Sequence, residues 1–280
     1  MPASQPAAMV DRTALVRHRA RARLDRAAFL HDEARFEIQE RLAEVNRTFT
    51  APAIVTAFPG FWGDFLPGAT VVPDEDILPL QPGVHDLVIH AMALHWANDP
   101  VGQIVQCRRA MVADGLFLAV FLAEGTLSEL RTALAEAEIA LTGGLSPRVA
   151  PMGGLRDLGR LLQRAGLALP VADSSRRTAT YPDLFALITD LRMMGETNAL
   201  ARRRVPATRD LFRRAAEIYQ DSFPAGQGRI RASFDLIFLT GWSPHESQQK
   251  PLRRGSASTR LADALGTIGF GDSTTLAPGQ

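Results

Sequence analysis

Cysteine is almost absent from this chain, in which Cys107 is the only one. A single cysteine excludes an intrachain disulfide and any zinc or iron–sulfur site built from cysteines. Long apolar runs are also missing, because no stretch approaches the roughly 18 residues needed to span a bilayer. The first ten residues contain no hydrophobic signal core. We therefore expect no transmembrane segment.

Lysine is equally scarce, since Lys250 is the only lysine among 31 basic residues. The arginines are scattered and balanced by 30 acids, so we attribute the bias to the coding sequence and expect no nucleic-acid partner. Residues 12–26 are rich in arginine, as in a mitochondrial targeting helix. They run directly into an amphipathic stretch, so we favour an ordinary basic helix start and a cytoplasmic protein.

An apolar content of 46% allows one large core or two modest ones. We expect an α/β domain over residues 12–250, after a loose leader at 1–11 and before a flexible tail at 251–280. Within the domain, residues 12–50 are expected to form N-terminal helices, and residues 142–222 a helical cap over the ends of the strands.

Apolar and β-branched runs predict strands at 53–57, 70–72, 86–90, 116–122 and 231–240. Helical periodicity predicts one or two helices in 24–45 and further helices at 99–112, 126–141, 153–165, 182–200 and 207–222, with a short one near 261–265. Strands alternate with helices over 86–141, which predicts parallel β-α-β units with helices on both faces of a sheet. A ligand crevice is then expected at the carboxyl ends of the strands.

Several blocks, in order, carry a family resemblance: HDLVI at 85–89, LHWAND at 94–99, RAMVADGLF at 109–117, GTLSELR at 125–131, GGLSP at 143–147, LRMMGETN at 191–198, GW at 241–242, SQQKP at 247–251 and RGS at 254–256. In these blocks the chain resembles a family of class I S-adenosylmethionine-dependent methyltransferases from bacteria and mitochondria. That family includes an assembly factor of respiratory complex I. The match extends over most of residues 12–257.

The resemblance implies a seven-stranded sheet with a pocket for S-adenosylmethionine above the first strands. The strand that ends at His90 would be the fourth. Residues of the following loop would lie beside the methionine end of the cofactor, namely Ala91, Met92, Leu94, His95 and Trp96. Asp74 and Glu75 match an acidic pair beside the adenine, whose amino group a carboxylate can bind as acceptor.

The turn after the first strand departs from the family. It offers Gly60 and Gly63 as cofactor-binding positions, but Phe58, Phe61 and Trp62 stand between and before them. Such rings occupy room that the cofactor needs. Only sixteen residues, 58–73, separate Ala57 from Asp74, so at most one short crossover fits. No residue can be named as the acid that binds the ribose; the nearest carboxylate, Asp64, falls inside the turn. We predict a truncated cofactor lobe in which the cofactor is bound weakly or has been lost.

Histidines at 85, 90 and 95 raise the question of a metal site. His85 and His90 are an odd number of residues apart in one strand and so point to opposite faces, and no carboxylate cluster completes a site. We expect no metal. His95 and Trp96 lie just past the strand and face the crevice, either as ligand contacts or as an aromatic lid. Cys107 lies among apolar residues of a helix and is interpreted as structural.

Candidate substrate contacts are Tyr181, Arg192, Glu196 and Trp242. Arg192 and Glu196 are four residues apart on a predicted helix, so a simple ion pair is the alternative. Tyr181, Tyr219 and Trp242 could equally be core residues at the ends of elements. Arg253 and Arg254 could bind an acidic partner or belong to a solvated terminus.

Three functions follow from these observations. The resemblance favours methyl transfer to a small molecule or a protein, for which the sequence identifies no catalytic residue. The eroded turn favours a non-catalytic assembly or binding protein with a protein partner. Hydroxylation of a protein side chain is a third function, supported by family analogy alone.

Overall fold

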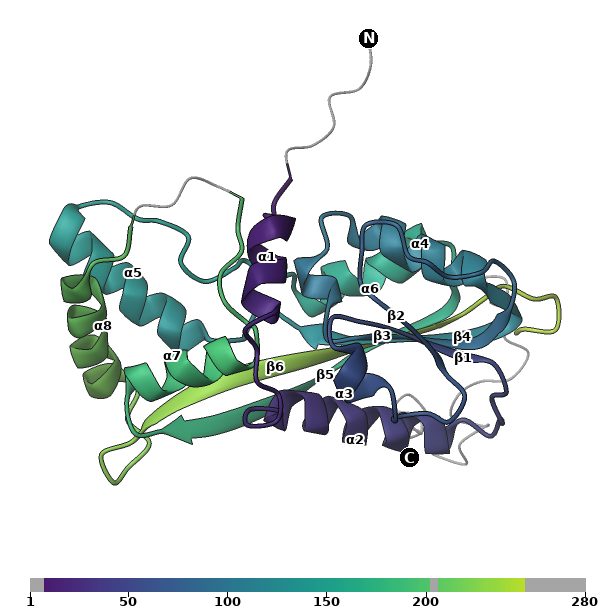
Figure 1. Ribbon diagram of the computed structural model, residues 1–280, viewed down its shortest axis with the longest axis horizontal. Coiled ribbons are helices and arrows are strands. Elements are labelled where there is room, and N and C mark those ends of the chain that lie inside the picture. Colours follow the sequence, from purple (N-terminus) through teal and green to yellow (C-terminus); the bar gives the residue numbers. More distant parts are fainter. Residues whose placement is uncertain (1–7, 202–205, 250–280) are drawn as a thin grey trace, which may run out of the picture. The chain divides into compact units, whose positions relative to one another are not determined.

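Six strands form one sheet in the computed structural model, which describes residues 8–201 and 206–249 (Figure 1). The sheet order is β2-β1-β3-β4-β6-β5. The strands are β1 Pro52–Thr56, β2 Thr70–Val72, β3 His85–Ala91, β4 Met111–Leu122, β5 Ala168–Tyr181 and β6 Ile230–Trp242. The first four are parallel, and β6 and β5 are antiparallel additions. The predicted α/β class is confirmed.

The strand count implied by the resemblance was wrong by one among the described residues. The strand that contains His90 is β3, the third along the chain and not the fourth. Only thirteen residues, 57–69, connect β1 to β2, and they contain a single four-residue helix, α3 Pro59–Trp62. That length leaves no room for a second strand–helix unit, so the cofactor lobe is truncated as predicted.

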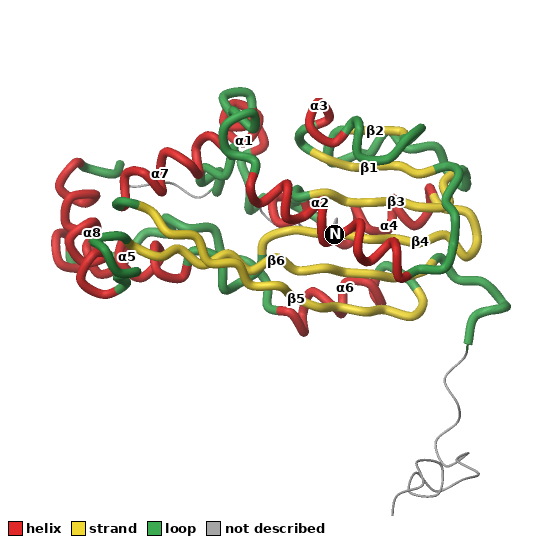
Figure 2. Tube along the Cα trace, turned by 90° about the horizontal axis from the view of Figure 1, so that it is seen from below, coloured by secondary structure: helices red, strands yellow, loops and turns green. Residues whose placement is uncertain are grey.

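Helices cover both faces of the sheet (Figures 1 and 2). Helix α2, Phe29–Glu44, packs on the face that carries Ile54 and Ile89. Helices α4, Pro100–Ala110, and α6, Leu155–Arg164, pack on the opposite face with Val55 and Val88. Successive strand residues point to opposite faces, so continuous apolar runs are needed when both faces are buried. This is why β1 and β3 are readable from sequence.

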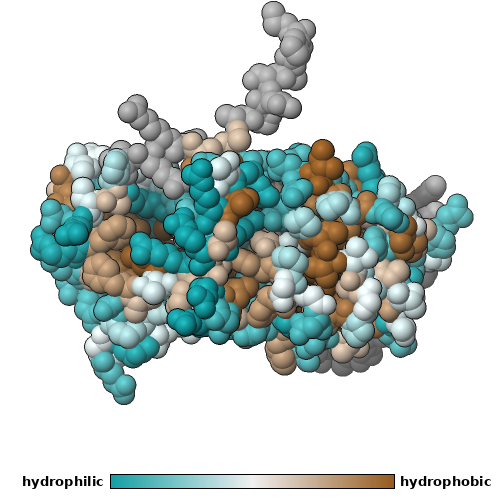
Figure 3. All heavy atoms as spheres, viewed as in Figure 1, coloured by the Kyte–Doolittle hydropathy of each residue, from teal (hydrophilic) through white to brown (hydrophobic). Residues whose placement is uncertain are grey.

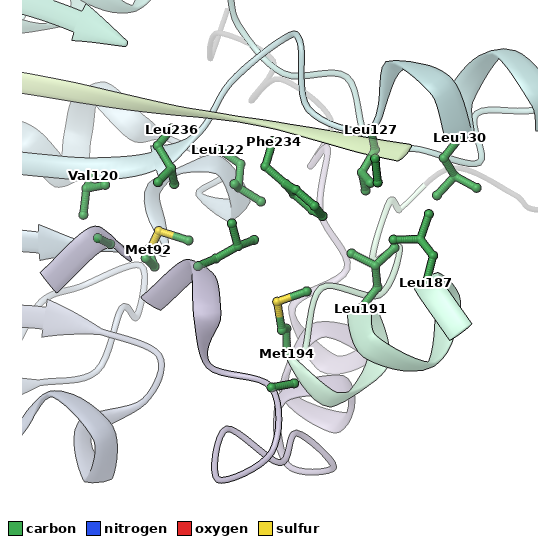
Figure 4. Packing of buried hydrophobic residues seen from close by; sticks show 14 of the residues in the cluster. Met92, Val120, Leu122, Leu127, Leu130, Leu187, Leu191, Met194, Phe234 and Leu236 are labelled. Carbon is green, nitrogen blue, oxygen red and sulfur yellow. The ribbon is translucent and has the colours of Figure 1, made fainter. Parts of the chain in front are cut away.

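The cap consists of α5 Ser128–Thr142, α7 Leu184–Met193 and α8 Arg209–Ser222, beyond the end of β4. Leu122, the last residue of β4, pairs with Leu236, whereas the preceding part of β6 pairs only with β5. The helices pack around this two-stranded extension (Figure 2). Figure 4 shows Leu187 and Leu191 of α7 pointing toward Leu127 and Leu130.

The segment predicted as a helical cap, residues 142–222, also contains the fourteen-residue strand β5. This strand lies at the edge of the sheet and pairs only with β6. Its sequence is polar, with Ser174, Arg176 and Thr178 at exposed or partly exposed positions. Polar and charged edge strands protect a sheet from pairing with other chains, and they lack the apolar run that identifies a strand.

The predicted helix at 182–200 ends at Met193, because Gly195 adopts a left-handed conformation with φ +80°. The Gly195 amide donates to the Arg192 carbonyl at 3.1 Å, and the Glu196 amide to the Leu191 carbonyl at 2.9 Å. These two bonds form a Schellman motif, which terminates a helix at a glycine. Glu196 therefore lies past the helix end, so it is not placed one helical turn from Arg192 on the same helix face.

The leader was also predicted too long. Val10 is buried and forms an antiparallel bridge with Leu200. Asp11 then caps α1, Arg12–Arg19, by accepting a hydrogen bond from the Ala14 amide at 2.9 Å. The predicted tail at 251–280, its short helix and Arg253 and Arg254 lie outside the described residues.

Candidate binding site at the strand ends

Helix α1 is held beside the carboxyl ends of the parallel strands. The Asp11 amide donates to the Ala199 carbonyl at 2.7 Å, and the Val10 amide donates to Asn98 Oδ1 at 2.9 Å. Leu15 of α1 packs with Trp96, which lies in the short helix η1, Leu94–Trp96, that follows β3. The N-terminal segment therefore covers the place where the crevice was predicted.

Asp74, which follows β2, is engaged by α1. Arg19 Nη1 donates to both carboxylate oxygens of Asp74, at 2.8 and 2.9 Å. Arg12 Nη2 donates to the Asp74 backbone carbonyl at 2.6 Å. Asp74 is only 4% exposed, so this charge is neutralised by arginines of its own chain. Glu75 is exposed, and its carbonyl accepts a bond from Gln103 Nε2 at 3.0 Å.

Aromatic rings fill the turn after β1. Trp62 is fully buried, and its Nε1 donates to His31 Nδ1 of α2 at 3.1 Å. The rings of Phe58 and Phe61 lie 5.2 and 5.5 Å from the His31 ring, and Phe65 lies 5.3 Å from Trp62. We call His31, Phe58, Phe61, Trp62 and Phe65 the aromatic cluster. Edge-to-face contacts of this kind stabilise a core.

The two glycines of the turn do not form a cradle for a ligand. Gly60 and Gly63 are both exposed, and neither has a positive φ. A Cβ added at Gly63 would lie 2.9 Å from the Pro59 carbonyl oxygen, so the packing of α3 itself accounts for that glycine. Asp64 is 80% exposed at its side chain and pairs with Arg35 at 3.1 Å. No ribose-binding acid is present in this turn.

Glu196 forms a buried polar group with His95 and Trp96, which follow β3. Glu196 accepts a hydrogen bond from Trp96 Nε1 at 2.8 Å and lies 3.1 Å from His95 Nε2. Burial alone would raise the pKa of Glu196, but His95 and the bonds from His95 and Trp96 lower it below its usual value. The ion pair weighed for Arg192 and Glu196 is not formed in the described part of the chain.

His90 is fully buried and bonds to α4 through Gln103 Oε1 at 2.8 Å. The Gln103 amide nitrogen bonds to the Glu75 carbonyl, which fixes the amide orientation and makes His90 Nε2 the donor. Burial lowers the pKa of both His90 and His31 to about 4, so both rings are neutral at pH 7. Within the described residues, His90 Nδ1, His95 Nδ1 and Arg19 Nη2 are buried without a hydrogen-bond partner.

Beside this group, under the cap, lies a cavity of about 340 Å³. We call it the cap cavity; its apolar wall includes Trp96, Leu122, Leu127, Leu130, Leu134 and Leu191. Glu196 and Arg192 also line it, as do Arg148 and Asn198. In Figure 3, apolar side chains are visible on the side of the molecule where α5, α7 and α8 lie. The volume lies within the roughly 300–1,000 Å³ of small-molecule sites.

The structure thus separates the predicted site residues. Trp96, Arg192 and Glu196 come together in the cap cavity, with His95 behind Glu196. Asp74 lies under α1, and Met92 and Ala91 are buried core residues. Tyr181 is also a core residue, with its hydroxyl bonded to Asp190 at 2.7 Å.

Trp242 does not line the cap cavity. It pairs with Leu116, six residues before Leu122, the last residue of β4, which borders the cavity. Six residues of strand span about 20 Å, so Trp242 lies about that far from the carboxyl ends of the parallel strands, toward their amino ends. The antiparallel direction of β6 is the reason, because its last residues run back to the amino ends of the parallel strands.

Sequence reasoning missed several residues of the site: Arg12, Arg19, His31, Gln103 and the leucines of α5. A signal existed for two of them. Arg12 and Arg19 are seven residues apart, which places them on one face of a helix, two turns apart. No periodicity could have paired His31 with Trp62, because that contact joins separate elements across the sheet end.

The histidines at 85, 90 and 95 do not converge on a metal. His85 Nδ1 lies 3.1 Å from the Ala51 carbonyl at the start of β3, away from the strand end. No group of three His, Cys, Asp or Glu side chains in residues 8–201 and 206–249 could hold a metal ion. None of the helices in those ranges has the length and apolar character that crossing a bilayer requires.

No protein-family model matches the chain. It is 41% identical over 187 residues to "Arginine-hydroxylase NDUFAF5, mitochondrial" of Dictyostelium discoideum, covering 66% of this chain and 43% of that protein. The human protein of the same name is 36% identical over 203 residues, 72% of this chain and 59% of its own length. A malonyl-[acyl-carrier protein] O-methyltransferase of Laribacter hongkongensis is 32% identical over 188 residues, 67% and 61% of the two chains.

The chain therefore spans less than two thirds of the length of these relatives. Among solved structures, the YcgJ protein of Bacillus subtilis aligns with a TM-score of 0.47 and 12% identity, over 75% of this chain and 98% of that one. The family resemblance found in the sequence blocks is confirmed by the sequence relatives.

Proposed function

We propose that this chain, a homologue of the NDUFAF5 proteins and of the malonyl-[acyl-carrier protein] O-methyltransferases, is a binding protein that does not hold S-adenosylmethionine at its strand ends. The observation that supports this most directly is the bidentate contact of Arg19 with Asp74. The carboxylate that the resemblance assigns to adenine is already bonded to its own chain. In this proposal the cap cavity is the ligand-binding site.

The residues at the strand ends do not fit S-adenosylmethionine. The cofactor would have to displace Arg19 from Asp74 and find space beside the buried Trp62. It would also lack an acid for its ribose, because Asp64 faces solvent. Each missing polar contact removes about 1–3 kcal/mol. Two such losses weaken binding by about 30- to 20,000-fold.

Methyl transfer is the second candidate function. It is supported by the position of residues 91–96 at the end of β3 and by Trp96, which borders the cap cavity. For the cofactor to bind, α1 would have to leave Asp74. When bound, S-adenosylmethionine supplies an activated methyl group, and the protein has mainly to position the acceptor.

The printed names of the relatives assign arginine hydroxylation and O-methylation of a malonyl carrier protein to those proteins. For this chain, a protein partner in the assembly of a respiratory complex is the partner class that we propose. We propose the cytoplasm as the compartment, although the NDUFAF5 relatives are named as mitochondrial.

Calorimetric titration with S-adenosylmethionine and S-adenosylhomocysteine tests the proposal. We expect no binding at millimolar ligand by the full chain. Arg19→Gln removes the bidentate partner of Asp74 and leaves Arg12 3.4 Å from its carboxylate; it is expected to remain without binding, because Trp62 still fills the turn. Arg17→Gln, on an exposed position of the same helix, is the matched control. A micromolar Kd for the unmodified chain would overturn the proposal and favour methyl transfer.

A further inference from the structure

The walls of the cap cavity come from α5, residues 146–152, α7 with the residues after it, and residues 206–212, together with Trp96 of η1 and the end of β4. Most of this wall is aliphatic and includes Leu130 and Leu134 of α5 and Ile188 and Leu191 of α7. Figure 4 shows Leu191 pointing toward Leu130. A wall of this kind gains free energy by covering an apolar chain, in proportion to the area removed from water. The ligand body should therefore be aliphatic.

Most polar groups in the wall already have partners. Glu196 is bonded to Trp96 and His95. Asn198 Nδ2 donates to the carbonyls of Pro147 and Arg148, and Asn198 Oδ1 accepts from the Leu200 amide. The Arg148 guanidinium is 2.5 Å from the buried carboxylate of Glu138. These groups shape the wall and have little capacity left for a ligand.

Arg192 is the exception. It lies in the last turn of α7, lines the cavity and is exposed. Over residues 8–201 and 206–249, its side chain takes part in no ion pair or hydrogen bond. A guanidinium at the mouth of an apolar cavity suits a carboxylate, with which it forms charge-assisted and often bidentate hydrogen bonds. Glu196, the only carboxylate that the described residues place in the wall, is bonded to His95 and Trp96.

We propose that the cap cavity binds a linear aliphatic carboxylate, with its chain against the leucines of α5 and α7 and its head group on Arg192. This inference rests on the proposed binding function, in which the cap cavity is the ligand-binding site. It names an acidic amphipathic small molecule as the ligand class. A cationic side chain is disfavoured, because Arg192 would repel it and Glu196 is already bonded.

Calorimetric titration of the full chain with decanoate, methyl decanoate and decylamine tests the ligand class. We expect decanoate to bind more tightly than its methyl ester and decylamine to bind least. Arg192→Gln should weaken decanoate binding about tenfold to a hundredfold and leave the ester unchanged. Arg213→Gln, on an exposed residue of α8 outside the cavity wall, is the matched control.

Ile188→Trp places a large side chain in the cavity wall and should weaken binding of both decanoate and its ester. Thermal unfolding of each variant shows that it is folded. Equal binding of decylamine and decanoate, an unchanged Kd in Arg192→Gln, or no binding of decanoate would each overturn the ligand class. S-adenosylmethionine is titrated separately: its binding would refute the proposed function alone, whereas a failure of decanoate alone refutes only this inference.

Discussion

Replacing Asp74 by asparagine tests the contact that holds α1 over the strand ends. The change keeps the shape of the side chain and removes its charge. Arg19 Nη1 now donates to both oxygens of the charged carboxylate, at 2.8 and 2.9 Å; in the variant it finds one neutral amide oxygen, and the other oxygen is replaced by an NH2 group. The side chains of Arg19 and Asp74 are 10% and 6% exposed, so solvent cannot compensate.

Breaking a buried ion pair by removing one partner costs about 3–5 kcal/mol. We expect about 3 kcal/mol for Asp74→Asn, the lower end, because the amide oxygen still accepts one bond. For a unit of this size, 1 kcal/mol corresponds to roughly 2–4 °C in Tm, so the expected loss is about 6–12 °C. Urea unfolding at pH 7 and thermal unfolding measure both quantities.

The control is Asp157→Asn, which removes an exposed ion pair with Arg160. Exposed pairs contribute little, so we expect no measurable change. The double variant Arg19→Gln/Asp74→Asn should lose less free energy of unfolding than the two single variants added together, because removing both partners leaves no unpaired charge. If the free energy of unfolding of Asp74→Asn lies within about 0.5 kcal/mol of that of the unmodified chain, then the ion pair does not hold α1 in place.

Three further predictions concern the same region and the core. The free energy of unfolding should fall as the pH drops from about 6.5 to about 4, by about 1.4 kcal/mol per pH unit for each of His31 and His90. The reason is that burial lowers the pKa of both rings to about 4, so that only the unfolded chain binds protons in this range. In His31→Gln, urea unfolding at pH 7 and pH 5 should show about half the loss. Trp62→Ala should cost about 3–5 kcal/mol through the cavity left in the aromatic cluster, and an unchanged urea midpoint would contradict the buried position of Trp62. Cys107 should resist a thiol reagent until the protein unfolds, since it is fully buried and burial raises its pKa; rapid labelling of the native chain would contradict that placement.

Long apolar segments were the part of the fold that could be predicted. Strands β1 and β3 are buried on both faces, and each carries an apolar core, residues 53–55 and 87–89, that marks it as a strand. The edge strand β5 has neither property, because it pairs on one side only and exposes polar side chains. Helix α7 was predicted too long because its termination depends on the left-handed conformation of Gly195, which a search for periodicity does not detect.

Only a few residues of the candidate site could be proposed from the sequence. Placing His95 and Trp96 just past β3 follows from strand direction, and Trp96 does border the cap cavity. Trp242 was misplaced because the antiparallel direction of β6 is a property of the whole sheet. Neither the length of a segment nor its residue types indicate which edge of the sheet its last residue reaches.

Apolar periodicity, the order of the motifs and the lengths of the connections were enough to predict the α/β class, the family and the short connection after β1, because each can be seen directly along the chain. The packing of the elements was needed to show that Arg19 bonds to Asp74, that Trp62 is buried against His31, and that the cap encloses a cavity beside Glu196. Each of these contacts joins residues from different elements. Their formation depends on how helices and strands pack, and the free energy of that packing is not encoded in any single segment.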